Sequence, residues 1–282
     1  MEGTGTKLTS PTVVRDLLGR HGVRLRKGLG QNFLVDGNIL ARIVDLAGPR
    51  ADETAVEVGA GVGTLTVALA PHVRELLAVE VDGRLIPILE EQTASHPNVR
   101  VLRADFRELA LGDFGERILL VGNLPYGITS DVLLKLIRER AVVDRALFMV
   151  QAEVAEKLVA PPGPEASRLG VHLRAYFETE VVRKVPRTVF FPPPEVNSAL
   201  VRLTKLPVPR VAAGEAALEW TLAVLFSTRR KTLRRALLAR LSMAEVDRLL
   251  GELGLDPRVR GEALPLPELD RLTQALWDAG LV

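Results

Sequence analysis

Residues 55–70 read AVEVGAGVGTLTVALA. The first four form a short apolar run typical of a buried strand, and the last seven show the pattern of a helix. Glycines at positions 59, 61 and 63 stand between them, and a glycine turn between strand and helix lets a ligand approach the backbone closely. Because Thr64 stands where the dinucleotide fingerprint has its third glycine, a nicotinamide or flavin cofactor is disfavoured. The stretch predicts an α/β domain that binds another small molecule at this strand end.

Carboxylates stand at the ends of three successive predicted strands. Glu57 lies two residues before the first glycine, where it suits an amino-acid ammonium group, bound directly or through water. Glu80 ends the next strand, about 20 residues after Gly59, where an acid holds ribose hydroxyls. Asp105 follows a third strand and can accept an adenine amine. One such acid alone is most often a solvated strand end, but the three together predict a pocket for a cofactor that contains adenosine.

A further apolar strand at residues 118–121 leads into the tetrapeptide NLPY at residues 123–126. The side-chain oxygen of Asn123 and the carbonyl of Leu124 can accept the two hydrogens of a nucleobase amine, and the ring of Tyr126 can stack on the base. A surface turn after a strand accommodates the same residue types. The position at the carboxyl end of a strand favours the base-binding interpretation.

Four segments carry a resemblance to a known family. They are GQNFL at 30–34, NLPY at 123–126, FFPPPEVNS at 190–198 and RRKTL at 229–233. The chain resembles the Rossmann-like methyltransferases that use S-adenosylmethionine and, among them, the rRNA adenine N6,N6-dimethyltransferases. The last segment is similar to the members that act on small-subunit (16S) rRNA. The resemblance runs from about Arg24 to the C-terminus and keeps the motifs in order.

The resemblance implies methyl transfer from S-adenosylmethionine to N6 of two adjacent adenines near the 3′ end of 16S rRNA, in the 30S subunit or its precursor. It places cofactor contacts at Asn32, Leu34, Gly59, Glu80, Asp105 and Asn123, to which the glycine motif adds Glu57 and Gly61. It places the catalytic, base-contacting residues at Asn123, Leu124, Tyr126 and Phe190. Two positions depart from the family pattern: Gly127 stands where many members have Asn, and Ala152 where a lysine is common.

The proline-rich segment at 190–198 predicts a rigid loop. Phe190 on this loop is expected to form the second face of a base sandwich opposite Tyr126. The alternative is a hydrophobic plug into the core, which is expected for one of Phe190 and Phe191.

Composition excludes several classes of chemistry. The chain has no cysteine, so disulfides, thiolate metal ligands and a cysteine nucleophile are ruled out. Its four histidines are scattered without metal-ligand spacing, and no metal is expected. No apolar run is long enough to span a bilayer and no signal peptide is apparent, so a cytoplasmic protein is expected, without membrane partners.

Net charge is only +2, so any RNA-binding signal must come from local clusters. One cluster contains Arg24, Arg26 and Lys27. The other contains the residues expected to contact RNA, which are Arg229, Arg230, Lys231 and Arg234. A run of charges is often only a solvated helix face, but few acids interrupt this one, which favours phosphate binding.

The pattern along the chain predicts two domains, and a monomer is expected. Residues 1–206 are expected to form the Rossmann-like methyltransferase sheet of an α/β protein, and residues 207–282 a small all-helical domain that docks rRNA. Within them we expect helices at Thr12–Gly19, Phe33–Leu46, Trp220–Leu241 and Met243–Leu250, and an antiparallel hairpin from Val171–Val185 and Ala199–Leu203.

Four other functions compete with this interpretation. The sister family that methylates large-subunit rRNA and confers macrolide resistance shares the first three motifs, but not the segment at 229–233. A non-catalytic RNA-binding or assembly factor on the same scaffold is disfavoured by the complete set of acids, glycines and NLPY. DNA adenine methyltransferases usually have two prolines where this chain has Leu124-Pro125, and small-molecule methyltransferases have no need of the basic C-terminal segment.

Overall fold

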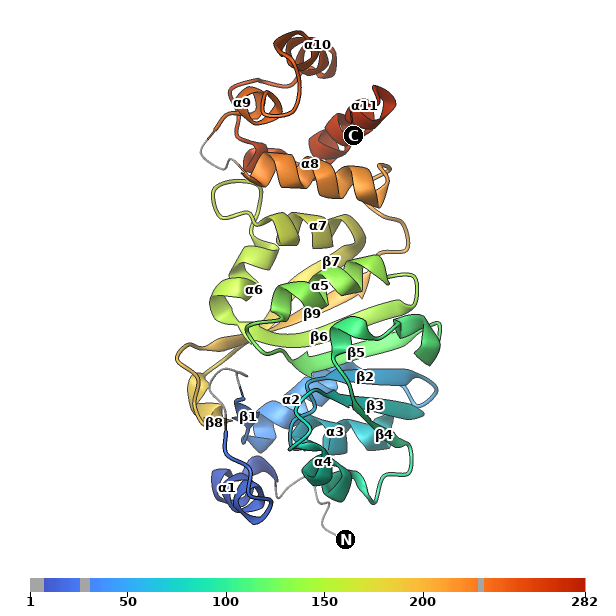
Figure 1. The fold of residues 1–282 in the computed structure, drawn as a ribbon, viewed down its shortest axis with the longest axis vertical. Helices are drawn as coiled ribbons and strands as arrows, with labels where there is room; N and C mark the ends of the chain where they lie inside the picture. Colours follow the sequence, from blue (N-terminus) through green and yellow to red (C-terminus); the bar gives the residue numbers. More distant parts are fainter. Residues whose placement is uncertain (1–7, 26–30, 228–230, 282) are drawn as a thin grey trace. The chain divides into compact units, whose positions relative to one another are not determined.

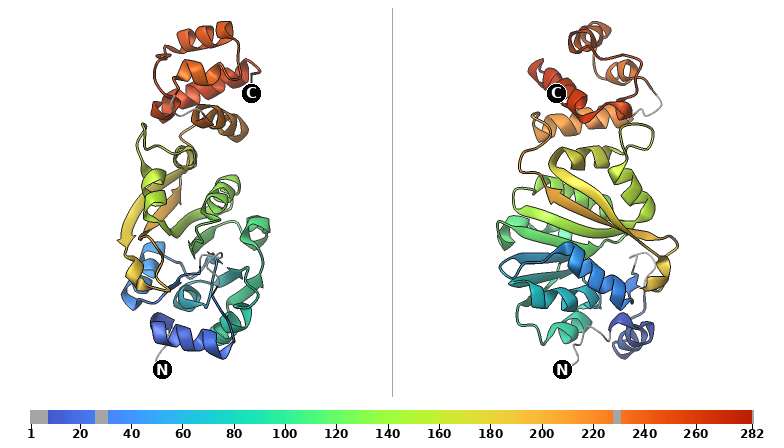
Figure 2. Two further views of the ribbon diagram at one scale, coloured as in Figure 1. Left: turned by 60° about the vertical axis from the view of Figure 1, so that its left-hand side comes forward. Right: turned by 180° about the vertical axis from the view of Figure 1, so that it is seen from behind.

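The computed structural model describes residues 8–25, 31–227 and 231–281 (Figures 1 and 2). The chain forms two compact units, one from residues 1–155 and 180–205 and the other from residues 156–179 and 206–282. The expected boundary after residue 206 lies next to one junction, whereas residues 156–179 group with the C-terminal helices. That residues 207–282 form a domain for rRNA docking stays a prediction.

The first unit is built on a seven-stranded sheet in the order β4-β3-β2-β5-β6-β9-β7. The strands are β2 (Thr54–Val58), β3 (Glu75–Glu80), β4 (Val99–Arg103), β5 (Ile118–Asn123), β6 (Val143–Gln151), β7 (Phe177–Val185) and β9 (Ser198–Lys205). The first five strands in this order, from β4 through β3, β2 and β5 to β6, pair in parallel, and β9 pairs antiparallel with β6. The predicted Rossmann-like α/β sheet is confirmed. Because β2 to β5 are parallel, their carboxyl ends meet at one edge, where this fold binds ligands.

Helices cover both faces of this sheet. They include α2 (Gly37–Ala47), α3 (Thr64–Leu69), α4 (Ile86–Thr93) and α5 (Thr129–Arg138), whereas α1 (Pro11–Arg20) packs beside the β1 and β8 segments. Helix α5 lies in front of the sheet in Figure 1, and the view from behind in Figure 2 shows α2 on the opposite face. The buried side of α2 packs with Leu119 of β5, Leu147 of β6 and Leu200 of β9. Single 3-10 turns occur as η3 (Ala70–His72), η4 (Phe106–Glu108), η5 (Leu111–Phe114) and η6 (Arg187–Val189).

The predicted helix at Phe33–Leu46 begins four residues late. Phe33–Leu34 instead form β1, which pairs antiparallel with β8 (Phe190–Phe191) in a separate two-stranded sheet. The carboxylate of Asp36 then caps α2 by accepting from the backbone N–H groups of Asn38 and Ile39, both at 2.9 Å. Pairing with a strand distant in sequence overrides the local helical pattern.

The prediction of one strand across Val171–Val185 is also wrong in its first half. Residues 168–176 form helix α7 (Arg168–Tyr176), and the strand begins only at Phe177. Ser167 caps the helix by accepting from the N–H of Gly170. A Cβ at Gly170 would lie 2.7 Å from the carbonyl oxygen of Leu158, so this glycine permits close backbone packing. The second strand of the predicted hairpin is confirmed as β9.

The second unit is helical in its C-terminal part. Its helices are α7, α8 (Glu215–Ser227), α9 (Leu233–Leu237), α10 (Met243–Leu253) and α11 (Leu266–Asp278), with the turn η7 (Gly261–Ala263); α6 (Ala152–Val159) spans the junction of the units. The helical pattern predicted over 220–241 is divided between α8 and α9, because Thr232 caps a new helix. Ser242 and Glu245 form a capping box at the start of α10. In the part of the chain described, no helix is long and apolar enough to cross a membrane.

Candidate active site

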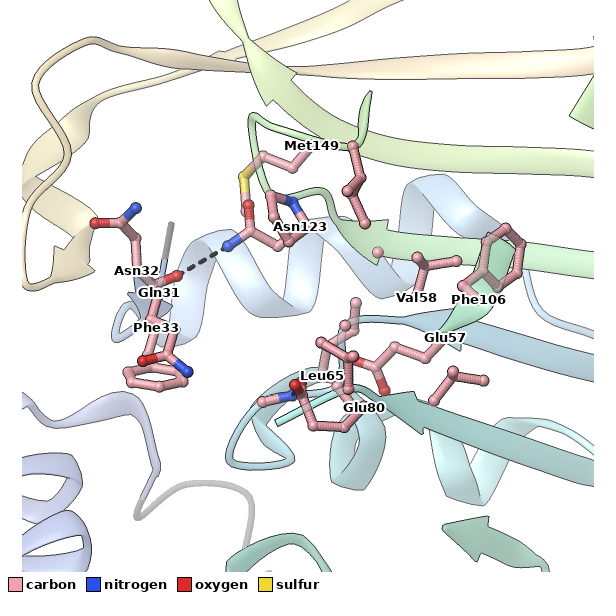
Figure 3. Close-up of a pocket in the computed structure, with 18 of the residues that line it drawn as sticks. Gln31, Asn32, Phe33, Glu57, Val58, Leu65, Glu80, Phe106, Asn123 and Met149 are labelled. Carbon is pink, nitrogen blue, oxygen red and sulfur yellow. Dashed lines mark hydrogen bonds between the residues drawn. The ribbon is translucent and has the colours of Figure 1, made fainter. Parts of the chain in front are cut away.

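A cavity of about 440 Å³ opens at the carboxyl ends of β2 to β5 (Figure 3). This volume suits a small-molecule ligand. The structure brings nine of the predicted residues together in its wall, namely Asn32, Leu34, Glu57, Gly59, Gly61, Glu80, Asp105, Asn123 and Tyr126. Leu124 and Phe190 do not line it. Arg229 and Arg230 lie outside the described residues, and Lys231 and Arg234 belong to the other unit.

The glycine turn adopts a backbone that side chains disfavour. Gly59, Gly61 and Gly63 have φ angles of 76°, 60° and 88°, all in the left-handed region. A Cβ at Gly61 would lie 3.1 Å from the ring of Phe33. The N–H groups of Gly59 and Ala60 both donate to the carbonyl of Val79 on β3. The turn is therefore fixed between the neighbouring strand and the Phe33 ring, with its backbone in the cavity wall.

Glu57 is buried, with 2% of its surface exposed. The hydroxyl of Thr66 on α3 donates to its Oε2 at 2.6 Å. Burial raises the pKa of Glu57 to about 8, partly opposed by the Thr66 hydrogen bond and reinforced by the nearby charge of Glu80. Glu57 is accordingly a carboxyl group whose charge depends on what occupies the cavity.

Glu80 is held by backbone donors. Its two oxygens accept from the N–H groups of Gly61 and Asp82, each at 2.8 Å. Burial raises the pKa of this carboxyl group as well, against the effect of these hydrogen bonds. Since a carboxylate has about four acceptor positions, Glu80 keeps capacity for the hydroxyls of a ligand while its orientation is set by the glycine turn.

Asp105 has a partner that the sequence analysis missed. The Nε and Nη2 atoms of Arg107 donate to the two Asp105 oxygens at 3.0 and 2.6 Å, and Nη1 reaches Asp131 on α5 at 3.2 Å. The side-chain hydrogen bond from Arg107 is the main reason why the pKa of Asp105 is lowered. The sequence signal for this pairing is a basic residue two positions after an acid that caps a turn. Asp131 is distant in sequence, so no local pattern indicates its contact with Arg107.

The segment that leads into β1 is fastened over the cavity by a second acid that the sequence analysis missed. Asp82 accepts from the amide of Gln31 at 2.8 Å and from Nε of Arg84 at 2.9 Å. Arg84 also donates to the carbonyl of Arg24 at 2.8 Å. The pKa of Asp82 is lowered to about 2, chiefly by the side-chain hydrogen bond from Arg84. These contacts fix the QNFL segment, and with it Asn32 and Leu34, at the cavity.

Asn123 is the last residue of β5, and its side chain is oriented by the QNFL segment. Its Nδ2 donates to the carbonyl of Asn32 at 2.9 Å, the dashed line in Figure 3. This arrangement leaves Oδ1 as the acceptor that the amide can offer a ligand. Leu124 is buried, and its N–H donates to the carbonyl of Met149 at 3.0 Å. Partial burial raises the pKa of the Tyr126 phenol, and the Ser198 hydroxyl acts in the opposite direction.

Phe190 lies in the core of the first unit, with 4% of its surface exposed. It stands opposite Leu34 in the β1–β8 pairing, and Leu34 lines the cavity. The more exposed neighbour, Phe191, lies beneath the guanidinium of Arg15. The alternative of a hydrophobic plug into the core therefore applies to Phe190, which lies one strand away from the cavity wall. Its contact with a target base stays a prediction.

The predicted RNA contacts in the second unit differ in how they are engaged. Lys231 is exposed, whereas Arg234 makes two hydrogen bonds to Asp247 on α10, at 2.7 and 2.8 Å. The pairing joins α9 to α10, and no local sequence pattern indicates Asp247 as the partner. RNA binding by this segment stays a prediction.

Gly122 offers a test of how tightly the site is built. A Cβ at this position would lie 2.6 Å from the carbonyl oxygen of Val58, which belongs to backbone and cannot move aside cheaply. We expect Gly122→Ala to lower the free energy of unfolding by about 1–3 kcal/mol and to reduce turnover by displacing Asn123. Gly112→Ala, where a Cβ meets nothing within 4 Å, is the matched control. Urea unfolding curves would measure both, and equal stabilities would contradict the close packing.

The parallel sheet, the glycine turn and the acids at successive strand ends define a class I S-adenosylmethionine-dependent methyltransferase. The model of the family "Ribosomal RNA adenine dimethylase" matches residues 22–268. Small-subunit rRNA methyltransferase A proteins of Geobacillus thermodenitrificans and Bacillus mycoides are each 40% identical to the chain, over 95% of it and 97% of the relative. The chain therefore belongs to the ribosomal RNA adenine dimethylase family.

Solved structures agree with this assignment. The 23S rRNA methyltransferase ErmE is 32% identical, with a TM-score of 0.70, and the match covers 87% of this chain and 99% of that one. A dimethyladenosine transferase from Plasmodium falciparum has a TM-score of 0.78 at 24% identity, covering 88% and 98% of the two chains, and supports the fold.

Proposed function

We propose that this protein dimethylates N6 of two adjacent adenines near the 3′ end of small-subunit rRNA, with S-adenosylmethionine as the methyl donor. The observation that carries the proposal is the position of Asn123, which offers one amide acceptor at the cavity formed by the glycine turn and the strand-end acids. Full-length similarity to small-subunit rRNA methyltransferase A proteins supports the choice of substrate. The protein acts as a cytoplasmic monomer on the 30S subunit or its precursor.

The residues of the cavity suit the cofactor. Glu57 would hold its ammonium group, Glu80 its ribose hydroxyls and Asp105 its adenine amine, while Asn32, Leu34, Gly59 and Gly61 form the surrounding wall. When bound, S-adenosylmethionine supplies a methyl group on a sulfonium, which is already activated for transfer. The chain itself needs to bind and orient the cofactor and the target base and to exclude water from them.

The target adenine must leave its stack to reach a buried cofactor. Oδ1 of Asn123 and the carbonyl of Leu124 accept the two N6 hydrogens, which favours a pyramidal nitrogen with its lone pair directed away from the ring. Tyr126 stacks on the base, and Phe190 provides the second face. Catalysis is then positioning and electrostatic stabilisation, and the methylated amine loses its proton to water without a general base.

Docking of the structured RNA is assigned to the second unit through Arg229, Arg230, Lys231 and Arg234. The large-subunit alternative has a specific observation in its favour, because the 23S rRNA methyltransferase ErmE shares the fold at 32% identity. The higher identity to small-subunit enzymes over nearly the whole chain outweighs it.

Methyl transfer to isolated subunits tests the proposal. Purified protein and labelled S-adenosylmethionine would be incubated separately with undermethylated 30S and 50S particles, and the modified nucleosides mapped by mass spectrometry. We expect N6,N6-dimethyladenosine in 30S rRNA. Label confined to 50S particles would assign the large-subunit activity, and no label in either, with the cofactor bound, would overturn the enzymatic proposal.

A further inference from the structure

The two-stranded sheet connects the cavity to a basic rim on the surface of the first unit. Phe33 pairs with Phe191 and Leu34 with Phe190. Since Phe33 and Leu34 line the cavity, Phe191 stands one strand away from its wall. Figure 1 shows β1 and β8 side by side with α1 next to them, and contacts between α1 and β8 agree. We call Arg15 on α1, Phe191 on β8 and Arg187 on the η6 turn that leads directly into β8 the α1–β8 rim.

Helix α1 is firmly attached at this place. Its apolar side, Val14, Leu17 and Leu18, packs in one cluster with Phe33 and with Val62 of the glycine turn. The exposed side of α1 is therefore held in a fixed position relative to the cofactor site. A charge on that side has a defined place beside the cavity.

The two arginines of the rim have no carboxylate partner in the described part of the chain. The Arg15 guanidinium lies 5.1 Å from the centroid of the Phe191 ring, a cation–π geometry that leaves its N–H groups available. Arg187 is exposed; its backbone N–H donates to Oδ1 of Asn197 at 3.0 Å and its Nη1 to the Glu195 carbonyl at 3.4 Å. By contrast, Arg20 on the same helix as Arg15 is paired with Glu91.

We propose that the α1–β8 rim binds the RNA backbone on either side of the target adenine. The inference rests on the proposed function and assigns an RNA contact in the first unit, separate from the basic segment of the second. A base extruded into a cavity leaves its flanking phosphates at the mouth, and exposed guanidinium groups bind phosphate with two parallel hydrogen bonds. Phe191 holds Arg15 in place and presents an aromatic ring of the kind on which neighbouring bases stack.

Charge removal on the rim tests this assignment. Arg15→Gln and Arg187→Gln would be compared with the control Arg20→Gln in methyl-transfer assays on undermethylated 30S particles from 50 to 200 mM salt. We expect each rim variant to raise KM for the particle by roughly threefold to tenfold. Each lost phosphate contact should also make the rise of KM between 50 and 200 mM salt about threefold smaller than in the unmodified protein. Binding of S-adenosylhomocysteine should be unchanged, and the control should match the unmodified protein.

A double substitution tests the role of Phe191. If its ring acts by holding Arg15, Phe191→Leu combined with Arg15→Gln should be no worse than the poorer single variant. Rim variants with unchanged KM and salt dependence would overturn the proposal while 30S methylation itself persists. Loss of S-adenosylhomocysteine binding in these variants would assign the rim a structural role instead. Absence of methylation by the unmodified protein would refute the proposed function and not the rim alone.

Discussion

Replacing Asn123 with alanine is expected to lower kcat for 30S methylation by roughly 100-fold or more. The same change should weaken S-adenosylhomocysteine binding by less than about tenfold. In the proposed role the amide oxygen accepts from the target amine, while Nδ2 donates to the Asn32 carbonyl at 2.9 Å. Alanine removes both interactions, so the base loses its orientation and the QNFL segment loses one of its attachments. Single-turnover kinetics and calorimetric titration would separate the two effects.

Asn98 provides the control for this experiment. Its amide also contacts backbone that is distant in sequence, donating to the carbonyls of Ala70 and Val73 at 2.8 and 3.0 Å. Asn98, however, precedes β4 and so lies at the amino ends of the strands, away from the cavity. Asn98→Ala should lower stability without a specific loss of kcat. If Asn123→Ala behaved like Asn98→Ala, with lower stability and normal turnover per folded molecule, Asn123 would be structural.

The residues of the site that local sequence encodes lie around one cavity, as the strand pattern predicts, while their roles in binding the cofactor stay a prediction. Glycines 59, 61 and 63 are recognisable because only glycine adopts this backbone readily, and Glu57, Glu80 and Asp105 lie at the ends of apolar strands whose parallel order brings them together. That the expected residues line one cavity is therefore a consequence of periodicity and strand order.

Features that depend on distant partners could not be predicted in this way. The β1–β8 pairing places Phe33 and Leu34 in a strand, so that the helix begins at Gly37, and no pattern within residues 33–46 indicates this. The attachments of Asp105 to Arg107 and of Arg234 to Asp247 are visible only when the chain is folded. Phe190 was expected at a target base and lies in the core, because an aromatic residue in a proline-rich loop suits either environment.

Glu57→Gln is expected to stabilise the cofactor-free protein at alkaline pH. The pKa of Glu57 is raised from 4.5 to about 8 in the folded protein, so folding is favoured while the group is protonated. Its contribution to stability declines as pH rises from 4.5 to about 8 and is constant above that, at a cost of roughly 3–5 kcal/mol. Glutamine stays neutral and keeps an acceptor for Thr66. The advantage of the variant in thermal unfolding should grow over this range; a constant difference would contradict the raised pKa.

In the proposed role of Glu57 at the cofactor's ammonium group, the same substitution should weaken cofactor binding, because a buried carboxylate is stabilised by a cation beside it. An ammonium group beside Glu57 favours the charged form, so binding releases a proton below about pH 8, and affinity rises with pH by at most about tenfold per unit. We expect Glu57→Gln to lose roughly 10- to 100-fold in affinity for S-adenosylhomocysteine and most of the pH dependence of that affinity.

5′-Methylthioadenosine, which lacks the amino-acid group, is the control ligand and should bind both proteins equally. Titration calorimetry in buffers of different ionisation enthalpy measures the proton release, and a flat pH profile with the unmodified protein would remove Glu57 from the ammonium site.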